Sequence, residues 1–181
     1  AHKNPKTYDR LLNADQLISV KRYEEAEKML ERVKISALSD DDIKGTGHFE
    51  RINLYLRTGR ADEAFEIFCK NKKFFDIYFG SPARERMAGS FYDVAADVLS
   101  IKGDEQGAMQ YISYIRKWSQ KYEPAFPVMS GISYVRVLKN LGNSQWQDVY
   151  ASLKNQIENY NGYQMKWQKE NTVNLLEDAV K

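Results

Sequence analysis

Residues 59–68 of this 181-residue chain read GRADEAFEIF. A glycine opens the segment, Asp62 and Glu63 follow, the small Ala64 comes next, and the large Phe68 stands four residues later. Glycine ends helices because it adopts the left-handed conformation without steric cost, and acidic side chains are favoured in the first turn of the next helix. A small side chain also lets two helices cross closely. The segment therefore predicts the turn and second helix of an antiparallel hairpin.

The same order of residues recurs along the chain. Ala26, Ala108 and Val149 occupy the position of Ala64, and successive anchors lie 38, 44 and 41 residues apart. A large apolar residue stands four positions after each anchor: Leu30, Phe68, Ile112 and Leu153. Periods of about 20 to 50 residues with one helical hairpin per repeat are typical of solenoids. Between these turns the apolar residues recur at three and four, which predicts an all-α fold.

These repeats resemble the tetratricopeptide-repeat family over roughly residues 6–160. The residues that carry the resemblance are the turn at 59–64, then Tyr23, Ala26 and Leu30 in the first copy, and Ala96, Gly103, Ala108 and Ile112 in the third. The repeats are longer than the family's usual length of about 34 residues. The family's tryptophan position is occupied by Arg10, His48, Tyr92 and Gly131. A helical bundle with chance similarity in its turns is the alternative interpretation.

The resemblance implies one domain, residues 1–181, folded as a superhelix of about four antiparallel helical hairpins with a C-terminal capping helix. We expect the hairpins at about 6–38, 41–73, 82–122 and 126–160, and a polar-faced cap at 163–181. In such a fold the first helices of the hairpins line a concave groove. By register, the groove-facing residues are Asp15, Ser19, Phe49, Asn53, Arg57, Asp93, Asp97, Ser100, Arg136, Lys139 and Asn140.

The function that the resemblance implies is a non-enzymatic adaptor or scaffold that binds a peptide or protein segment in this groove, without a cofactor. The family's clamp for a C-terminal carboxylate is not met, because Leu11 and Asp15 stand at its first two places. We therefore do not expect a receptor for chaperone tails.

No catalytic motif stands out in the chain. It has no P-loop and no nucleophile elbow. One cysteine and two histidines leave little for a His/Cys zinc site, and Cys69 in an apolar helical stretch is typical of packing. His48 and Glu50 are two residues apart, so they cannot cooperate on one helix face. We predict no catalytic residues and no metal.

A pentatricopeptide-like domain that binds single-stranded RNA is the alternative function. Residues 59–73, with Phe65, Phe68 and three lysines, resemble one hairpin of that family. Those proteins keep a near-constant repeat length to stay in step with the bases, whereas the spacing here varies. The formal net charge is only +2, and nucleic-acid-binding surfaces are usually strongly basic. Nucleic acid is therefore the less favoured partner.

Aromatic residues make up 13% of the chain. We expect Phe74, Phe75, Tyr78 and Phe79 in a connector between the second and third hairpins, and a second aromatic group runs from Tyr150 to Trp167. Aromatic residues at helical spacing are mostly core, but an exposed cluster marks a partner site. We expect part of one group to contact another protein or a second copy of this chain.

No stretch approaches the roughly 18 consecutive apolar residues that indicate a membrane span. We therefore expect no membrane span within this chain. A single unpaired cysteine fits a reducing compartment. The expected location is cytoplasmic, with the chain standing alone or as the soluble part of a larger or membrane-anchored protein.

Overall fold

The structure is a computed structural model, and it describes residues 5–35, 40–123, 126, 128–163 and 165–181. Over these residues the chain forms nine α-helices and no β-strand, so the all-α prediction is confirmed. The chain divides into two compact units, residues 1–84 and residues 85–181, which we call the N-terminal and C-terminal units. Each is described by itself, and a single superhelical domain stays a prediction.

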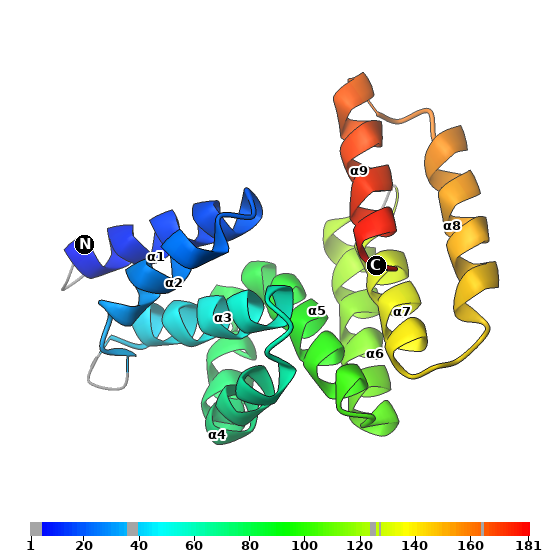
Figure 1. The fold of residues 1–181 in the computed structure, drawn as a ribbon. Helices are drawn as coiled ribbons and strands as arrows, with labels where there is room; N and C mark the ends of the chain where they lie inside the picture. Colours follow the sequence, from blue (N-terminus) through cyan, green and yellow to red (C-terminus); the bar gives the residue numbers. More distant parts are fainter. Residues whose placement is uncertain (1–4, 36–39, 124–125, 127, 164) are drawn as a thin grey trace. The chain divides into compact units, whose positions relative to one another are not determined.

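The N-terminal unit contains two helical hairpins (Figure 1). The first pairs α1 (Pro5–Ser19) with α2 (Tyr23–Glu31), and the second pairs α3 (Asp41–Arg57) with α4 (Ala61–Phe79). A short 3-10 helix, Pro82–Arg84, ends the unit. The last residues of the first predicted hairpin, 36–38, lie outside the described residues. The second hairpin is longer than the predicted 41–73, because α4 continues to Phe79.

The C-terminal unit contains two further hairpins and a final helix. The hairpins pair α5 (Glu85–Ile101) with α6 (Glu105–Tyr122) and α7 (Val128–Asn140) with α8 (Trp146–Asn159). The final helix, α9 (Lys166–Asp178), packs on α8 at the place predicted for the cap. Its Leu176 is fully buried in a cluster that includes Val135 of α7 and Ile157 of α8.

All four hairpin turns have the same backbone hydrogen bond. In each turn one backbone N–H is donated to the carbonyl oxygen five residues earlier. The four bonds run from Arg22 to Leu17 at 2.8 Å, from Arg60 to Tyr55 at 2.8 Å, from Asp104 to Leu99 at 2.9 Å, and from Asn143 to Leu138 at 2.9 Å. This is the bond that closes a Schellman motif. The repeat is therefore present in the turns themselves.

The Schellman motif needs one residue with positive φ immediately before the donor. That residue is Gly59 at 73°, Gly103 at 76° and Gly142 at 69°, which confirms the glycines as helix-ending positions. In the first turn the residue is Lys21, with φ of 62°. A side chain is strained in this conformation, so the first copy makes the same turn at an energetic cost that glycine avoids.

The small residues predicted at the hairpin crossings are buried. Ala26, Ala64 and Ala108 are each 0% exposed. The large residues four positions later are buried as well: Leu30, Phe68 and Ile112. The fourth copy is looser, because Val149 is only partly buried, although Leu153 is buried. In the part of the chain that the structure describes, no helix is long and apolar enough to cross a membrane.

Candidate functional site

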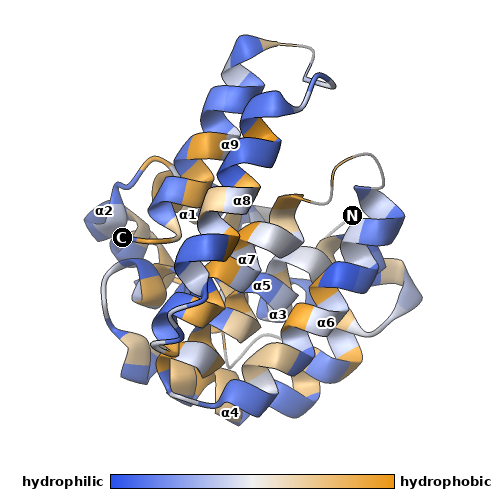
Figure 2. Cartoon of the chain, turned by 90° about the vertical axis from the view of Figure 1, so that its right-hand side faces the viewer, coloured by the Kyte–Doolittle hydropathy of each residue, from blue (hydrophilic) through white to orange (hydrophobic). Residues whose placement is uncertain are grey.

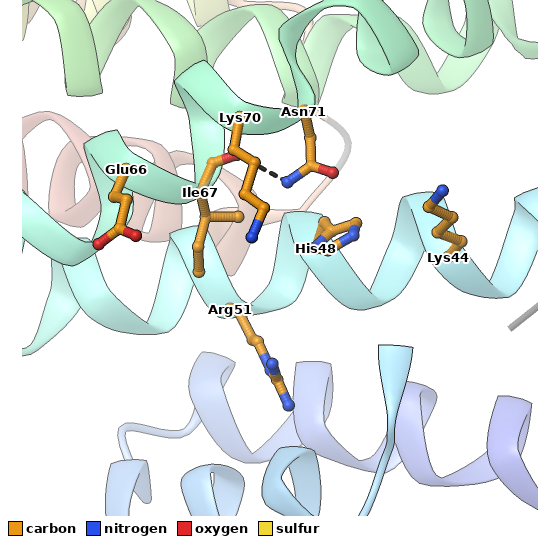
Figure 3. Close-up of a pocket in the computed structure, with 7 residues that line it drawn as sticks. All are labelled: Lys44, His48, Arg51, Glu66, Ile67, Lys70 and Asn71. Atoms are coloured by element: carbon orange, nitrogen blue, oxygen red, sulfur yellow. Dashed lines mark hydrogen bonds between the residues drawn. The ribbon is translucent and has the colours of Figure 1, made fainter. Parts of the chain in front are cut away.

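A pocket of about 410 Å³ lies between α3 and α4 of the N-terminal unit (Figure 3). Lys44, His48 and Arg51 line it from α3, and their spacing of four and three residues places them on one face of that helix. The residues that line it from α4 are Glu66, Ile67, Lys70 and Asn71. The volume falls in the range of about 300–1,000 Å³ that is typical of small-molecule sites.

The cationic side chains of the pocket differ in direction. Lys70 extends from α4 toward α3, whereas Arg51 points to the side of α3 that faces away from α4 (Figure 3). Arg51 donates hydrogen bonds from Nη2 to the carbonyl oxygens of Leu30 at 3.1 Å and Val33 at 3.2 Å. It therefore contributes its charge to the pocket while its guanidinium holds the end of α2.

Positive charge in the pocket is not neutralised by contact. Lys44 Nζ lies 4.9 Å from the centroid of the Phe74 ring. Among the described residues, no acidic side chain forms an ion pair with Lys44, Arg51 or Lys70. Glu66, the one carboxylate in the lining, lies at the opposite end of the pocket from Lys44 (Figure 3).

The positive charge of the pocket affects the protonation of His48. Its Nδ1 atom is buried and has no hydrogen-bond partner among the residues that the structure describes. Burial, and after it the nearby cations Lys44, Arg51 and Lys70, together lower the pKa of His48 to about 4. The imidazole is consequently neutral at pH 7. A pocket lined by three cations and one neutral imidazole is suited to bind an anion.

A second polar cluster joins α5 and α7 of the C-terminal unit, and we call it the α5–α7 seam. Its members are Asp93, Asp97 and Ser100 on α5 and Ser133, Arg136 and Asn140 on α7. Arg136 Nη1 lies 3.1 Å from both carboxylate oxygens of Asp93 and 3.7 Å from Oδ2 of Asp97. Burial would disfavour the charge of Arg136, but the two aspartates outweigh it and raise the pKa of the guanidinium.

The remaining members of the seam are bonded across the two helices. Asn140 Nδ2 donates to Asp97 Oδ1 at 2.8 Å and to Ser100 Oγ at 2.9 Å. Ser133 donates its hydroxyl to Asp93. Five residues predicted to face the groove thus come together: Asp93, Asp97, Ser100, Arg136 and Asn140.

The seam side chains are less exposed to solvent than predicted for an open groove. The side chain of Arg136 is only 15% exposed, and those of Asp93 and Asp97 are 21% and 15% exposed. They pair with one another because α5 and α7 pack side by side. Lys139, the remaining predicted groove residue of α7, donates from its ammonium group to the backbone carbonyl of Val180 and holds the end of the chain.

The predicted groove residues of the N-terminal unit do not form a comparable seam. Phe49 packs edge-on against Phe79, with ring centroids 6.5 Å apart. Asn53 is partly buried and Arg57 is exposed. Asp15 is exposed on α1, and Ser19 donates to the backbone carbonyl of Gln16.

Glu50 of α3 is a buried charged residue that the sequence analysis did not recognise as such. It is 4% exposed, and within the described part of the chain its Oε2 atom has no hydrogen-bond partner. Burial, together with the nearby carboxylate of Asp15, raises its pKa to about 8. Ile43, Gly47, Glu50 and Leu54 are all buried at spacings of four and three. This stripe is the signal in the sequence that places Glu50 on the core face.

The aromatic group from Phe74 to Phe79 is helical, which corrects the prediction of a connector. All four residues lie in α4. Phe75 is 0%, Phe79 5% and Tyr78 9% exposed, and Phe74 is partly buried. Phe75 and Phe79 are four residues apart and face α3, where His48 and Phe49 meet them edge-on. The group therefore packs the second hairpin, and it is not an exposed aromatic interface.

The C-terminal aromatic group is divided between core and surface. Tyr160 stacks on Phe126 with centroids 4.5 Å apart, and both are partly buried. Trp167 is 54% and Leu175 58% exposed on α9. In Figure 2, α9 is mainly hydrophilic, with a few hydrophobic positions among its residues.

Comparisons with known proteins add no identification. The chain matches no protein-family model, and searches of curated proteins and of solved structures found no match either. The resemblance to tetratricopeptide repeats therefore rests on the sequence pattern alone. Over the described residues, no group of three or more His, Cys, Asp or Glu side chains is placed to hold a metal ion.

Proposed function

We propose that this protein is a non-enzymatic interaction domain that binds a polypeptide segment along the α5–α7 seam. The observation that carries the proposal is that the seam is already ordered by its own hydrogen bonds. A partner would then bind without having to immobilise these side chains, and avoiding that ordering cost favours affinity. We also propose that the hairpins stack as tetratricopeptide-like repeats, a view supported by the four equivalent turns.

The hydrogen-bonding capacity left in the seam favours a particular kind of segment. Asn140 Nδ2 uses its two hydrogens on Asp97 and Ser100, so the carboxamide offers only its oxygen as an acceptor. Asp93 and Asp97 together outweigh the single charge of Arg136, which leaves the seam negative. The segment that fits supplies hydrogen-bond donors, from its backbone N–H groups or from lysine and arginine side chains.

An apolar contact is available beside these acceptors. Ile101 lies one helical turn beyond Asp97 on α5 and is 41% exposed. Ile101 and Asn140 are both exposed enough to be replaced without emptying the core. Arg136 is a poor choice for a binding mutant, because its loss would leave two partly buried aspartates without this cation.

A peptide-display selection tests the proposal. Random 12-residue peptides (about the length of a segment that two helices can hold) are selected on the full chain. The selected peptides are then measured against Ile101→Ser/Asn140→Ala. The matched control is Val20→Ser/Asn174→Ala, which removes an exposed apolar residue and an exposed asparagine that are not members of the seam. We expect donor-rich sequences whose affinity falls about tenfold or more, or about 1.4 kcal/mol, on the seam variant.

The control variant should bind these peptides like the unmodified chain. Failure to select any peptide, or equal affinity on the seam variant and the control, would refute the proposal. An RNA oligomer that binds with a steep salt dependence, while no peptide does, would instead support the RNA-binding alternative.

A further inference from the structure

We infer that the pocket between α3 and α4 is a binding site for a phosphate monoester, with Lys44 and Lys70 as its direct ligands. The site lies in the N-terminal unit, whereas the seam belongs to the C-terminal unit. The proposal for this pocket and the proposal for the α5–α7 seam can therefore be tested independently.

The first reason is uncompensated charge. Lys44, Arg51 and Lys70 all act on the same imidazole, which places three cations around one pocket. Like charges that line one pocket repel one another, and that repulsion opposes folding unless a counter-charge relieves it. Exposed lysines elsewhere in the protein do find carboxylates, as Lys72 does with Asp76 at 2.8 Å and Lys121 with Glu85 at 2.6 Å. Within the described residues, the pocket cations form no such ion pair.

The second reason is the division of roles among the cations. Arg51 donates its hydrogen bonds to the carbonyl oxygens of Leu30 and Val33. It therefore contributes positive electrostatic potential to the pocket but no direct hydrogen bond to the ligand. Lys44 lies beside the Phe74 ring, and no other described residue forms a hydrogen bond with its ammonium group. Lys70 enters from the opposite helix (Figure 3). Two flexible ammonium groups on facing helices can close on one anion from two sides.

The third reason concerns the charge of the ligand. With Glu66 included, the charged residues of the lining sum to two positive charges, because His48 is neutral at pH 7. A phosphate monoester carries about 1.5 to 2 negative charges at pH 7, since its second pKa is about 6. It therefore matches the pocket in charge and offers three acceptor oxygens. A carboxylate offers only one charge and satisfies the site less completely.

His48 provides a direct spectroscopic readout. The chain has only two histidines, His2 and His48, so a His48→Gln variant assigns the imidazole signals unambiguously. A bound dianion cancels the repulsion from the three cations and favours the imidazolium form. Binding should therefore move the His48 titration to higher pH.

The experiment titrates the full chain at pH 7.5 and constant ionic strength with inorganic phosphate, glycerol phosphate and a phosphoserine peptide. Sulfate and an unphosphorylated peptide serve as ligand controls. Imidazole NMR signals report binding. The test variant is Lys44→Gln/Lys70→Gln, and the matched control is Lys34→Gln/Lys73→Gln, which removes equal charge from exposed positions of the same unit.

We expect saturable shifts of the His48 signals with the monoesters, at least tenfold weaker binding by Lys44→Gln/Lys70→Gln, and unchanged binding by the control. Glycerol phosphate binding as tightly as the phosphopeptide would indicate a small-molecule ligand, and a clear preference for the phosphopeptide would indicate a modified polypeptide. Equal responses to sulfate and monoesters, or equal loss in both variants, would overturn the proposal. So would a single-stranded oligonucleotide that shifts the His48 signals when no monoester does, because a phosphodiester ligand would then be favoured.

Discussion

Replacing Glu50 by Gln removes a carboxyl group that the fold buries to 4% exposure beside α1. The native pKa of this group is about 8, against 4.5 for an ordinary glutamate. Between these values the folded chain holds a proton that the unfolded chain releases, so stability falls as the pH rises through this window. One pKa unit corresponds to about 1.36 kcal/mol. Glu50 should therefore cost the N-terminal unit roughly 3 kcal/mol on going from pH 5 to pH 8.

The Glu50→Gln variant should lose this pH dependence. Its amide is an unpaired buried group as well, which costs about 1–3 kcal/mol at every pH. The diagnostic quantity is therefore the change in unfolding free energy between pH 5 and pH 8, compared between the variant and the unmodified chain. Glu24→Gln, at an exposed position of α2, is the control and should keep the original pH dependence.

Urea unfolding can follow the two units separately. Trp118, Trp146 and Trp167 all lie in the C-terminal unit, so tryptophan fluorescence reports that unit, whereas far-UV circular dichroism reports both. The pH effect should appear in the dichroism transition. Equal slopes for Glu50→Gln and Glu24→Gln would refute the assignment of a protonated Glu50.

Three further predictions concern packing and turns. Ala64→Leu should overpack the crossing of α3 and α4, where Ala64 is 0% exposed, and lower the free energy of unfolding in urea by about 1–3 kcal/mol. Ala151→Leu, at an exposed position, is the comparison. Equal effects of the two substitutions would contradict the close crossing of the helices at Ala64. Lys21→Gly should stabilise by about 1 kcal/mol, because it relieves a φ of 62°; an unchanged or lower melting temperature would count against the strain. Arg136→Met should lower the free energy of unfolding by roughly 3 kcal/mol, because Asp93 and Asp97 lose the cation of Arg136. Adding Asp93→Asn to this variant should recover part of the loss. An Arg136→Met variant as stable as the unmodified chain would argue against the seam.

The local features of the fold could be predicted from the sequence because they depend on residues that are close to one another in the chain. The turns at Gly59, Gly103 and Gly142 need a positive φ, and glycine signals this directly. The burial of Ala26, Ala64 and Ala108 follows from periodicity. The predicted end of the second hairpin, at about residue 73, was wrong. In the structure, aromatic packing against α3 carries the helix on to Phe79.

The chemistry of the polar clusters was less predictable, because it depends on residues far apart in the chain. Arg136 and Asp93 were both placed on groove-facing positions, yet their pairing arises only when α5 and α7 pack together. The stripe of Lys44, His48 and Arg51 is visible in the sequence, but its significance comes from Lys70 on the opposite helix. Glu50 lies on a stripe of buried residues that is visible in the sequence, but its raised pKa arises from burial in the packed unit and from Asp15 of α1, which lies far away in the chain.

The shared geometry of the four hairpin turns bears on how the chain folds. Each turn is closed by a bond that spans five residues, so each pair of helices can meet without first ordering distant parts of the chain. Contacts between residues near in sequence cost little loop-closure entropy and favour fast folding. An emerging chain could therefore complete each hairpin in turn during synthesis, beginning with α1 and α2. The strained Lys21 makes that earliest turn the least favourable of the four to close.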